Sequence, residues 1–190
     1  LAQPQLLLMD EPLASLDAAR KQEILPFLAR LKSALRLPIL YVTHAMEEVT
    51  RLADHLVLIE SGQVIAAGPL EDVTSRADLA LSQRDDAGAV LPAIVAEHDP
   101  ARQLTTLDAG GAHLLVPLVD APIGHALRVR IPAREVILAR EAPTAISVHN
   151  IIAGTVRSVA QDTARRAALV EIGLPQGAFL ARVTPDAVAR

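Results

Sequence analysis

The sequence predicts an α/β segment followed by an all-β segment. Up to about residue 83, short apolar runs alternate with stretches whose apolar residues recur at helical spacing. From about residue 89 the apolar runs are short, alternate with polar residues and are separated by Gly and Pro, which is typical of a small β-barrel. The 190 residues, 51% hydrophobic and 21% charged, suffice for two packed cores. We therefore predict one domain over 1–83, a linker over 84–88 and a second domain over 89–190.

The first expected elements are a strand and a long helix. Leu6–Met9 is an apolar run between two prolines, which favours a buried parallel strand. Asp17 can cap a helix that extends from Ala18 to about Leu35. Pro26 lies inside this helix and predicts a kink or a later start.

Three further strands and a helix are expected before the linker. Ile39–Val42 is a second buried-type strand, and a helix follows over 45–53. Glu47-Glu48 in this helix fit a solvated helix face. Leu56–Ile59 is a third strand, and Gly62 marks the turn of a hairpin that continues through Val64–Ala66.

The predicted second domain consists of short strands. A similarity between Leu107–Gly110 and Val170–Gly173 indicates a weak internal repeat. The second copy ends before an equivalent of the strand pair that follows the first, so we expect a domain truncated at its C-terminus. The expected strands are Val90–Glu97, Leu104–Leu107, His113–Val116, Leu127–Ile131, Val136–Leu138, Ile151–Val159, Ala168–Ile172 and Phe179–Val183.

Composition excludes several classes of function. Eighteen Lys and Arg against 22 Asp and Glu give a net charge of -4, which disfavours a nucleic-acid partner. There is no cysteine, which excludes disulfides, thiolate metal sites and cysteine catalysis. No apolar run approaches the roughly 18 residues of a membrane span.

Two adjacent carboxylates follow the first predicted strand. Asp10 and Glu11 would lie at the carboxyl end of a parallel sheet, where α/β proteins bind ligands. Neighbouring carboxylates are unfavourable without a cation or a transferable proton. Mg²⁺ accepts such oxygen ligands, often through water, and a second carboxylate can activate a water nucleophile. Taken alone, the same residues also fit an acidic turn that caps a helix.

Two further motifs decide between these interpretations. Leu6–Pro12 reads Leu-Leu-Leu-Met-Asp-Glu-Pro and resembles a Walker B motif with its following glutamate. Ala14–Asp17 resembles a D-loop, and Tyr41–His44 resembles the strand that carries a switch histidine. In this order and spacing, the motifs resemble the ATP-binding subunits of ABC transporters, starting just before Walker B. The resemblance covers residues 1 to about 75 and implies part of a P-loop NTPase domain.

The resemblance implies a role for each matching residue. Asp10 would bind Mg²⁺ through water, Glu11 would be the general base for ATP hydrolysis, and His44 would contact the γ-phosphate. Asp17 would act across the interface of a homodimer. These roles fit phosphoryl transfer, in which positioning and electrostatics supply most of the catalysis. The other five histidines show no metal-ligand spacing, and no metal role is expected for them.

Two motifs of this family are missing from the sequence. A P-loop needs a Gly-Lys pair, and neither Lys21 nor Lys32 follows a glycine. The signature Leu-Ser-Gly-Gly-Gln is also absent. We therefore expect that the full protein is longer at its N-terminus, and that this polypeptide alone neither binds ATP tightly nor hydrolyses it.

The second segment is similar to the OB-like accessory barrel, of TOBE or Mop type, found in importers of oxyanions, sugars and polyamines. Ile146–Val156 resembles the start of a molybdate-binding Mop module, in which Ser147 and Asn150 would bind the oxyanion. His149 stands where the family has arginine, and Ala153 lacks the basic side chain often found there. A structural barrel that pairs two subunits is the alternative.

Together the resemblances imply the ATP-hydrolysing subunit of a molybdate importer. It would work as a homodimer beneath a transmembrane permease, on the cytoplasmic face of the inner membrane. A periplasmic or extracellular binding protein would deliver the solute. The alternatives are an importer for sulfate, a sugar or a polyamine, and a non-catalytic, oxyanion-binding regulatory fragment in which Asp10 and Glu11 are vestigial.

Overall fold

The chain divides into two compact units. A computed structural model describes residues 4–35 and 37–189, so the outermost residues of the predicted domains 1–83 and 89–190 lie outside it. The first unit extends to Leu56, and the second begins at Val57. The division expected at 84–88 rests on composition and stays a prediction.

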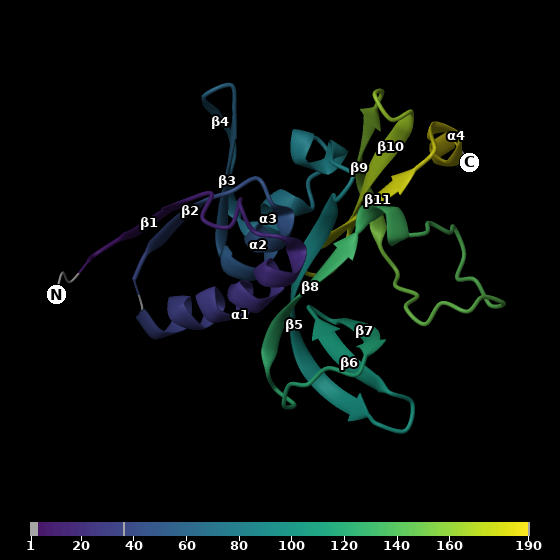
Figure 1. Cartoon of the computed structure of the whole chain (residues 1–190). Coiled ribbons are helices and arrows are strands. Elements are labelled where there is room, and N and C mark those ends of the chain that lie inside the picture. Colours follow the sequence, from purple (N-terminus) through teal and green to yellow (C-terminus); the bar gives the residue numbers. More distant parts are fainter. Residues whose placement is uncertain (1–3, 36, 190) are drawn as a thin grey trace. The chain divides into compact units, whose positions relative to one another are not determined.

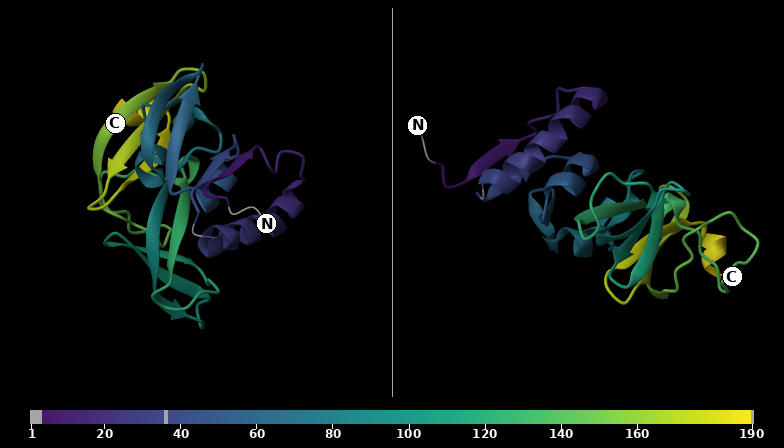
Figure 2. Two further views of the ribbon diagram at one scale, coloured as in Figure 1. Left: turned by 90° about the vertical axis from the view of Figure 1, so that its left-hand side faces the viewer. Right: turned by 90° about the horizontal axis from the view of Figure 1, so that it is seen from below.

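The first unit is a short βαβα segment. It contains β1 (Leu7–Asp10), α1 (Ala18–Leu35), β2 (Ile39–Val42) and α2 (Met46–Leu52). Strands β1 and β2 are parallel, with Asp10 opposite Val42. Helix α1 lies beside this strand pair (Figures 1 and 2). The predicted mixed α/β order is confirmed, whereas the late start expected from Pro26 is wrong, because α1 begins at Ala18 and contains the proline.

Asp17 begins helix α1 as its N-cap. The backbone N–H of Arg20 donates to Asp17 Oδ1 at 2.9 Å, and the N–H of Lys21 donates to the Asp17 carbonyl at 3.0 Å. A side-chain acceptor at this position satisfies a donor that the first helical turn leaves unpaired. The predicted cap is therefore confirmed.

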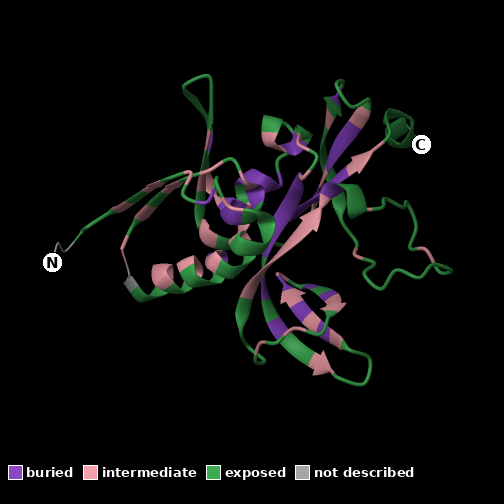
Figure 3. Ribbon diagram, viewed as in Figure 1, coloured by how far each residue is buried: buried purple, intermediate pink, exposed green. Residues whose placement is uncertain are grey.

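The two parallel strands are half exposed, so the expectation that they are buried is wrong. Alternate side chains point to the uncovered face of the strand pair, and Leu8, Leu40 and Val42 are 66%, 57% and 49% exposed. Figure 3 shows the corresponding alternation of intermediate and exposed positions along both strands. The physical reason is the period of two along a strand, which directs every second side chain to the uncovered face.

A hairpin lies at the boundary of the two units, with its first two residues in the first unit and the rest in the second. Strand β3 (His55–Glu60) pairs with β4 (Gln63–Pro69) through the turn Ser61-Gly62. Both turn residues have positive φ, 50° and 77°, as a two-residue type I′ turn requires. The predicted hairpin is confirmed. The short helices α3 (Leu70–Thr74) and η1 (Ala80–Gln83) follow.

Two antiparallel sheets make up the rest of the second unit. The first has the order β7-β6-β5-β8 and the second the order β11-β10-β9. Short helices η2 (Ala133–Glu135) and α4 (Pro185–Ala189) accompany them. The strands are β5 (Gly88–Asp99), β6 (Leu104–Ala109), β7 (Ala112–Pro117), β8 (Ala126–Pro132), β9 (Thr155–Asp162), β10 (Ala167–Gly173) and β11 (Ala178–Val183).

Both sheets contribute to one hydrophobic core. The buried residues come from β5, β6 and β7 of the first sheet, from β10 and β11 of the second, and from Leu174 between the last two strands (Figure 3). The predicted β-rich second part is confirmed by these sheets; closure into a barrel stays a prediction. The core residues are Leu91, Ala93, Val95, Leu107, Ala109, Leu114, Val170, Ile172, Leu174, Phe179 and Ala181.

The segment after β8 departs from the expected strands. Val136–Leu138 is not a strand, and β9 begins at Thr155 rather than at Ile151. Helix η2 turns the chain at this point, with the buried Ala133 donating its N–H to the Ala87 carbonyl at 2.9 Å. Residues 136–154 then form a largely exposed loop that projects from the sheets (Figure 1).

The stretch predicted as a linker is anchored by arginines. Arg182 of β11 donates to the carbonyls of Ser82 and Arg84 at 3.0 and 2.6 Å, and Arg165 pairs with Asp85 at 2.8 Å. Two of these contacts are to backbone carbonyls and one is to the Asp85 side chain, and all three hold this part of the chain within the second unit. In the part of the chain that is described, no helix is both long and apolar enough to cross a membrane.

Candidate functional site at the carboxyl ends of β1 and β2

Parallel pairing brings the polar residues of two motifs to one edge. Asp10 is the last residue of β1 and lies opposite Val42, the last residue of β2. Glu11 continues this register, since its N–H donates to the Val42 carbonyl at 2.9 Å. The residues that follow the two strands therefore start from neighbouring positions, although they are more than thirty positions apart in the sequence.

Glu11 and His44 are in direct contact. His44 Nδ1 lies 2.6 Å from Glu11 Oε1, and the side chains are 78% and 35% exposed. The carboxylate can only accept, so the imidazole nitrogen donates in this pair. Glu11 has φ 44°, in the left-handed region that side chains other than glycine seldom adopt. The structure thus joins the residues predicted as general base and γ-phosphate contact, in a position open to solvent.

The other two residues of the predicted ATP site lie on the same unit. Asp10 is exposed at the end of β1. Asp17 is the cap of α1 described above, and its carboxylate also lies 3.7 Å from Arg20 Nε in an exposed ion pair. The carboxylate of Asp17 is therefore engaged at the start of its own helix.

Asp10 is the residue of this edge that the sequence predicts as the Mg²⁺ contact. Within residues 4–35 and 37–189, no group of three or more His, Cys, Asp or Glu gathers to hold a metal ion. A single exposed carboxylate fits an ion that takes its remaining ligands from water and phosphate, as Mg²⁺ does. Asp10 therefore fits the predicted contact through water.

A buried carboxylate lies beside this edge and was missed by sequence reasoning. Glu47 is exposed, as expected for a solvated helix face, but Glu48 is only 2% exposed. The expectation was therefore wrong for Glu48. Helical spacing could have indicated this, because Glu48 lies four positions before Leu52 and three after Ala45, on the apolar side of α2.

Three donors satisfy the Glu48 carboxylate. Lys21 Nζ of α1 donates to Oε1 at 3.0 Å, and Tyr41 Oη of β2 donates to Oε2 at 2.9 Å. Thr43 Oγ1 also donates to Oε2 at 2.9 Å. A buried charge is tolerated when it is paired and its remaining lone pairs are bonded, and both conditions are met here.

The network shifts two pKa values in opposite directions. Burial, the hydrogen bond to Glu48 and the negative charges of Glu48 and Glu11 raise the pKa of Tyr41. Burial alone would raise the pKa of Glu48, but the hydrogen bonds from Lys21, Thr43 and Tyr41 together lower it. The network therefore favours a charged Glu48 and a neutral Tyr41.

The predicted oxyanion residues lie on the exposed loop 136–154. Asn150 Oδ1 accepts from the Leu115 N–H at 2.7 Å, and Asn150 Nδ2 donates to the Leu115 carbonyl at 2.9 Å. The amide thus pairs with the backbone of β7 as another strand would. Ser147 is exposed on the same loop.

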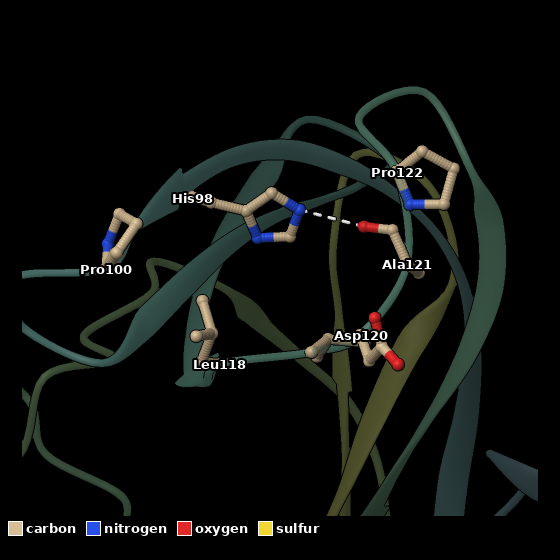
Figure 4. Close-up of a pocket in the computed structure, with 7 residues that line it drawn as sticks. His98, Pro100, Leu118, Asp120, Ala121 and Pro122 are labelled. Carbon is tan, nitrogen blue, oxygen red and sulfur yellow. Dashed lines mark hydrogen bonds between the residues drawn. The ribbon is translucent and has the colours of Figure 1, made fainter.

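An open hollow of about 680 Å³ occurs elsewhere, within the second unit. It is bounded by His98 of β5 and by the loop Leu118–Pro122 (Figure 4). His98 Nε2 lies 2.8 Å from the Ala121 carbonyl and Nδ1 lies 2.9 Å from Thr105 Oγ1. Both ring nitrogens are engaged by the protein, so His98 fastens the loop to the sheet.

Comparison with known proteins identifies similar sequences. No family model matches the chain. It is 49% identical to the molybdenum import ATP-binding protein ModC of Granulibacter bethesdensis, over 100% of this chain and 53% of that protein. The proteins of the same name from Methylococcus capsulatus and Rhodospirillum rubrum are 48% and 49% identical over 95% and 93% of the chain, and over 51% and 48% of their own lengths.

The chain spans about half the length of the curated relatives it matches. The similarity extends through both units rather than over the three motifs alone. The chain is therefore homologous to the molybdenum import ATP-binding proteins across about half of their length.

Proposed function

We propose that this chain forms part of the ATP-hydrolysing subunit of an ABC importer for molybdate. The observation that carries the proposal is the 2.6 Å contact between Glu11 and His44 at the carboxyl edge of two parallel strands. The relatives named for molybdenum import support both the reaction and the solute.

Each residue at this edge has a proposed task. Asp10 would hold Mg²⁺ through a water molecule, and the ion would neutralise phosphate charge when bound. Glu11 accepts a proton from the attacking water, and His44, oriented by its contact with Glu11, binds the γ-phosphate. Asp17 acts across the interface of a homodimer.

Residues 89–190 are proposed to be an OB-like barrel of TOBE or Mop type that pairs two subunits. Their shared core between two antiparallel sheets supports this architecture. The amide of Asn150 is already bonded to Leu115, which favours the structural role over molybdate binding by Ser147 and Asn150. The proposed assembly is a homodimer on a transmembrane permease, at the cytoplasmic face of the inner membrane, supplied by a binding protein.

A chimera tests the proposed reaction. Residues 1–190 replace the matching half of the Granulibacter bethesdensis relative, which aligns with 100% of this chain. We expect Mg²⁺-dependent ATP hydrolysis, and a loss on the order of 100-fold in Glu11→Gln, because a general base contributes about that much. Glu23→Gln, an exposed glutamate of α1, is the matched control and should retain activity.

The outcomes separate the candidate functions. A chimera without ATP hydrolysis, beside an active parent relative, would contradict the proposal. Uptake of molybdate, sulfate, a sugar or a polyamine by cells carrying the chimera and its permease identifies the solute. Molybdate binding to this chain in equilibrium dialysis, together with an inactive chimera, would favour the regulatory alternative.

A further inference from the structure

The buried carboxylate of Glu48 lies four positions after the exposed His44 in the sequence. His44 is 78% exposed, and its side-chain partner is Glu11. A side chain so exposed needs a fixed backbone to hold one position, because rotamer freedom is otherwise large. The contacts of the neighbouring residues show how this backbone is fixed.

The side chain of Thr43, the residue before His44, bonds to the backbone of Ala45, the residue after it. Thr43 Oγ1 accepts a hydrogen bond from the Ala45 N–H at 3.1 Å, which closes a tight turn around His44. The same hydroxyl donates a hydrogen bond to Glu48 Oε2 at 2.9 Å. The Glu48 carboxylate therefore sets the orientation of the Thr43 hydroxyl. Because this hydroxyl also closes the turn, the carboxylate helps to fix the turn around His44.

Glu48 joins four segments of the first unit. It belongs to α2 and binds Lys21 of α1, Tyr41 of β2 and Thr43 of the turn that carries His44. Lys21 in turn lies in the first turn of α1, where its N–H donates to the Asp17 carbonyl. The carboxylate thus ties the histidine turn to both helices and to the strand before it.

Stability alone gives a weak reason for this arrangement. A buried ion pair often contributes no more than well-packed apolar residues of similar volume, because both charges lose their hydration. A fully bonded polar network does, however, specify one arrangement of its members, because each donor has few other acceptors to which it could bond.

We propose that Glu48 is the positioning residue of His44, acting through the hydroxyl of Thr43, with Lys21 as its counter-charge. This inference rests on the proposed function for its importance to turnover. The placement of His44 can also be measured without ATP.

The first experiment uses the 190-residue chain itself. The ring ¹⁵N signals of His44, assigned by their loss in His44→Gln, report at fixed pH whether Nδ1 still donates to Glu11. We expect Glu48→Gln to move these signals towards those of a free imidazole. Glu47→Gln, an exposed neighbour on the same helix, should leave them unchanged. Unchanged signals in Glu48→Gln would overturn the proposal.

A double variant separates positioning from general support of the fold. Lys21→Met combined with Glu48→Met removes both charges and keeps the volume, but leaves Thr43 without its acceptor. We expect the thermal midpoint to recover relative to Glu48→Gln while the His44 signals stay displaced. Recovery of both would show a structural role only and overturn the proposal.

If the double variant does not fold, a pair of variants at Thr43 tests whether the Thr43 hydroxyl positions His44. Thr43→Ser keeps the bridging hydroxyl and should preserve the His44 signals, whereas Thr43→Val keeps the shape and should displace them. Equal signals in the two variants would overturn the proposal. Tyr41 fluorescence shows whether the network itself survives, because the sequence has one tyrosine and no tryptophan.

Turnover in the chimera supplies the functional test. We expect Glu48→Gln to lower kcat by about 10- to 100-fold, the cost of misplacing a catalytic group, with KM for ATP unchanged. A raised KM with unchanged kcat would contradict a positioning role. If the parent chimera does not hydrolyse ATP, the proposed function fails, and the His44 signals still decide the present inference.

Discussion

Neighbouring glutamates of α2 show how position on a helix, rather than residue type, determines a role. Glu47 lies in solvent, while Glu48 is buried and receives three hydrogen bonds. The difference arises because the side of α2 that carries Glu48 faces donors from α1 and β2. Charge alone predicted the same environment for both residues, since the donors lie up to twenty-seven positions away in the sequence.

The lowered pKa of Glu48 predicts sensitivity to acid. The folded chain holds this carboxylate charged, so the unfolded chain binds the proton more readily. Its contribution to stability is present above the ordinary titration range of glutamate and is lost as the pH falls through the folded pKa. We expect urea unfolding, followed by Tyr41 fluorescence, to show this loss, and Glu48→Gln to flatten it. If the free energy of unfolding fell with pH equally in both proteins, the loss could not be assigned to Glu48.

At the scale of elements, local patterns were most informative where a single residue determines the geometry. The cap at Asp17, the turn at Gly62 and the two short apolar strands β1 and β2 all follow from short-range rules. Val136–Leu138 did not follow, because a strand needs a partner along its edge and η2 directs the chain away from the sheets. Pairing partners are distant in sequence, which is why this error was not detectable locally.

The close approach of β5 and β8 predicts a sensitive position. A Cβ on Gly88 would lie 2.5 Å from the Ile131 carbonyl oxygen and 2.9 Å from Pro132 Cα, both backbone atoms of the paired strand. We expect Gly88→Ala to destabilise the second unit by about 1–3 kcal/mol, as overpacking does. Gly68→Ala is the control, since its Cβ would meet Val73 Cγ2 at an ordinary 3.7 Å. Urea unfolding measured by far-UV circular dichroism distinguishes them; equal stabilities would contradict this prediction.

At the scale of the whole chain, the two units differ in how much apolar surface they bury. The second unit has a continuous core drawn from five strands. The first exposes one face of its strand pair, and the buried apolar residues among those described in it are few: Leu13, Leu25, Met46 and Val49. Sequence composition predicted two packed segments, and the boundary that it placed at 84–88 by polarity stays a prediction beside the contact-defined units.

This difference predicts two unfolding transitions. Stability grows with buried apolar area, so the first unit should unfold at lower denaturant concentration than the second. Tyr41 lies in the first unit and reports on it alone, whereas far-UV circular dichroism records the helices and strands of both units. We expect the Tyr41 transition to come first. Coincident transitions would show that the two units unfold together.

The backbone of Glu11 has a consequence for how such a protein changes under selection. A side chain held at φ 44° carries a conformational cost of about 1–3 kcal/mol, which glycine would avoid. A library of variants sorted only for heat resistance would therefore enrich Glu11→Gly and discard the proposed base with it. Selection for thermal stability and selection for turnover therefore favour different residues at position 11. A gain in one of these properties at this position lowers the other.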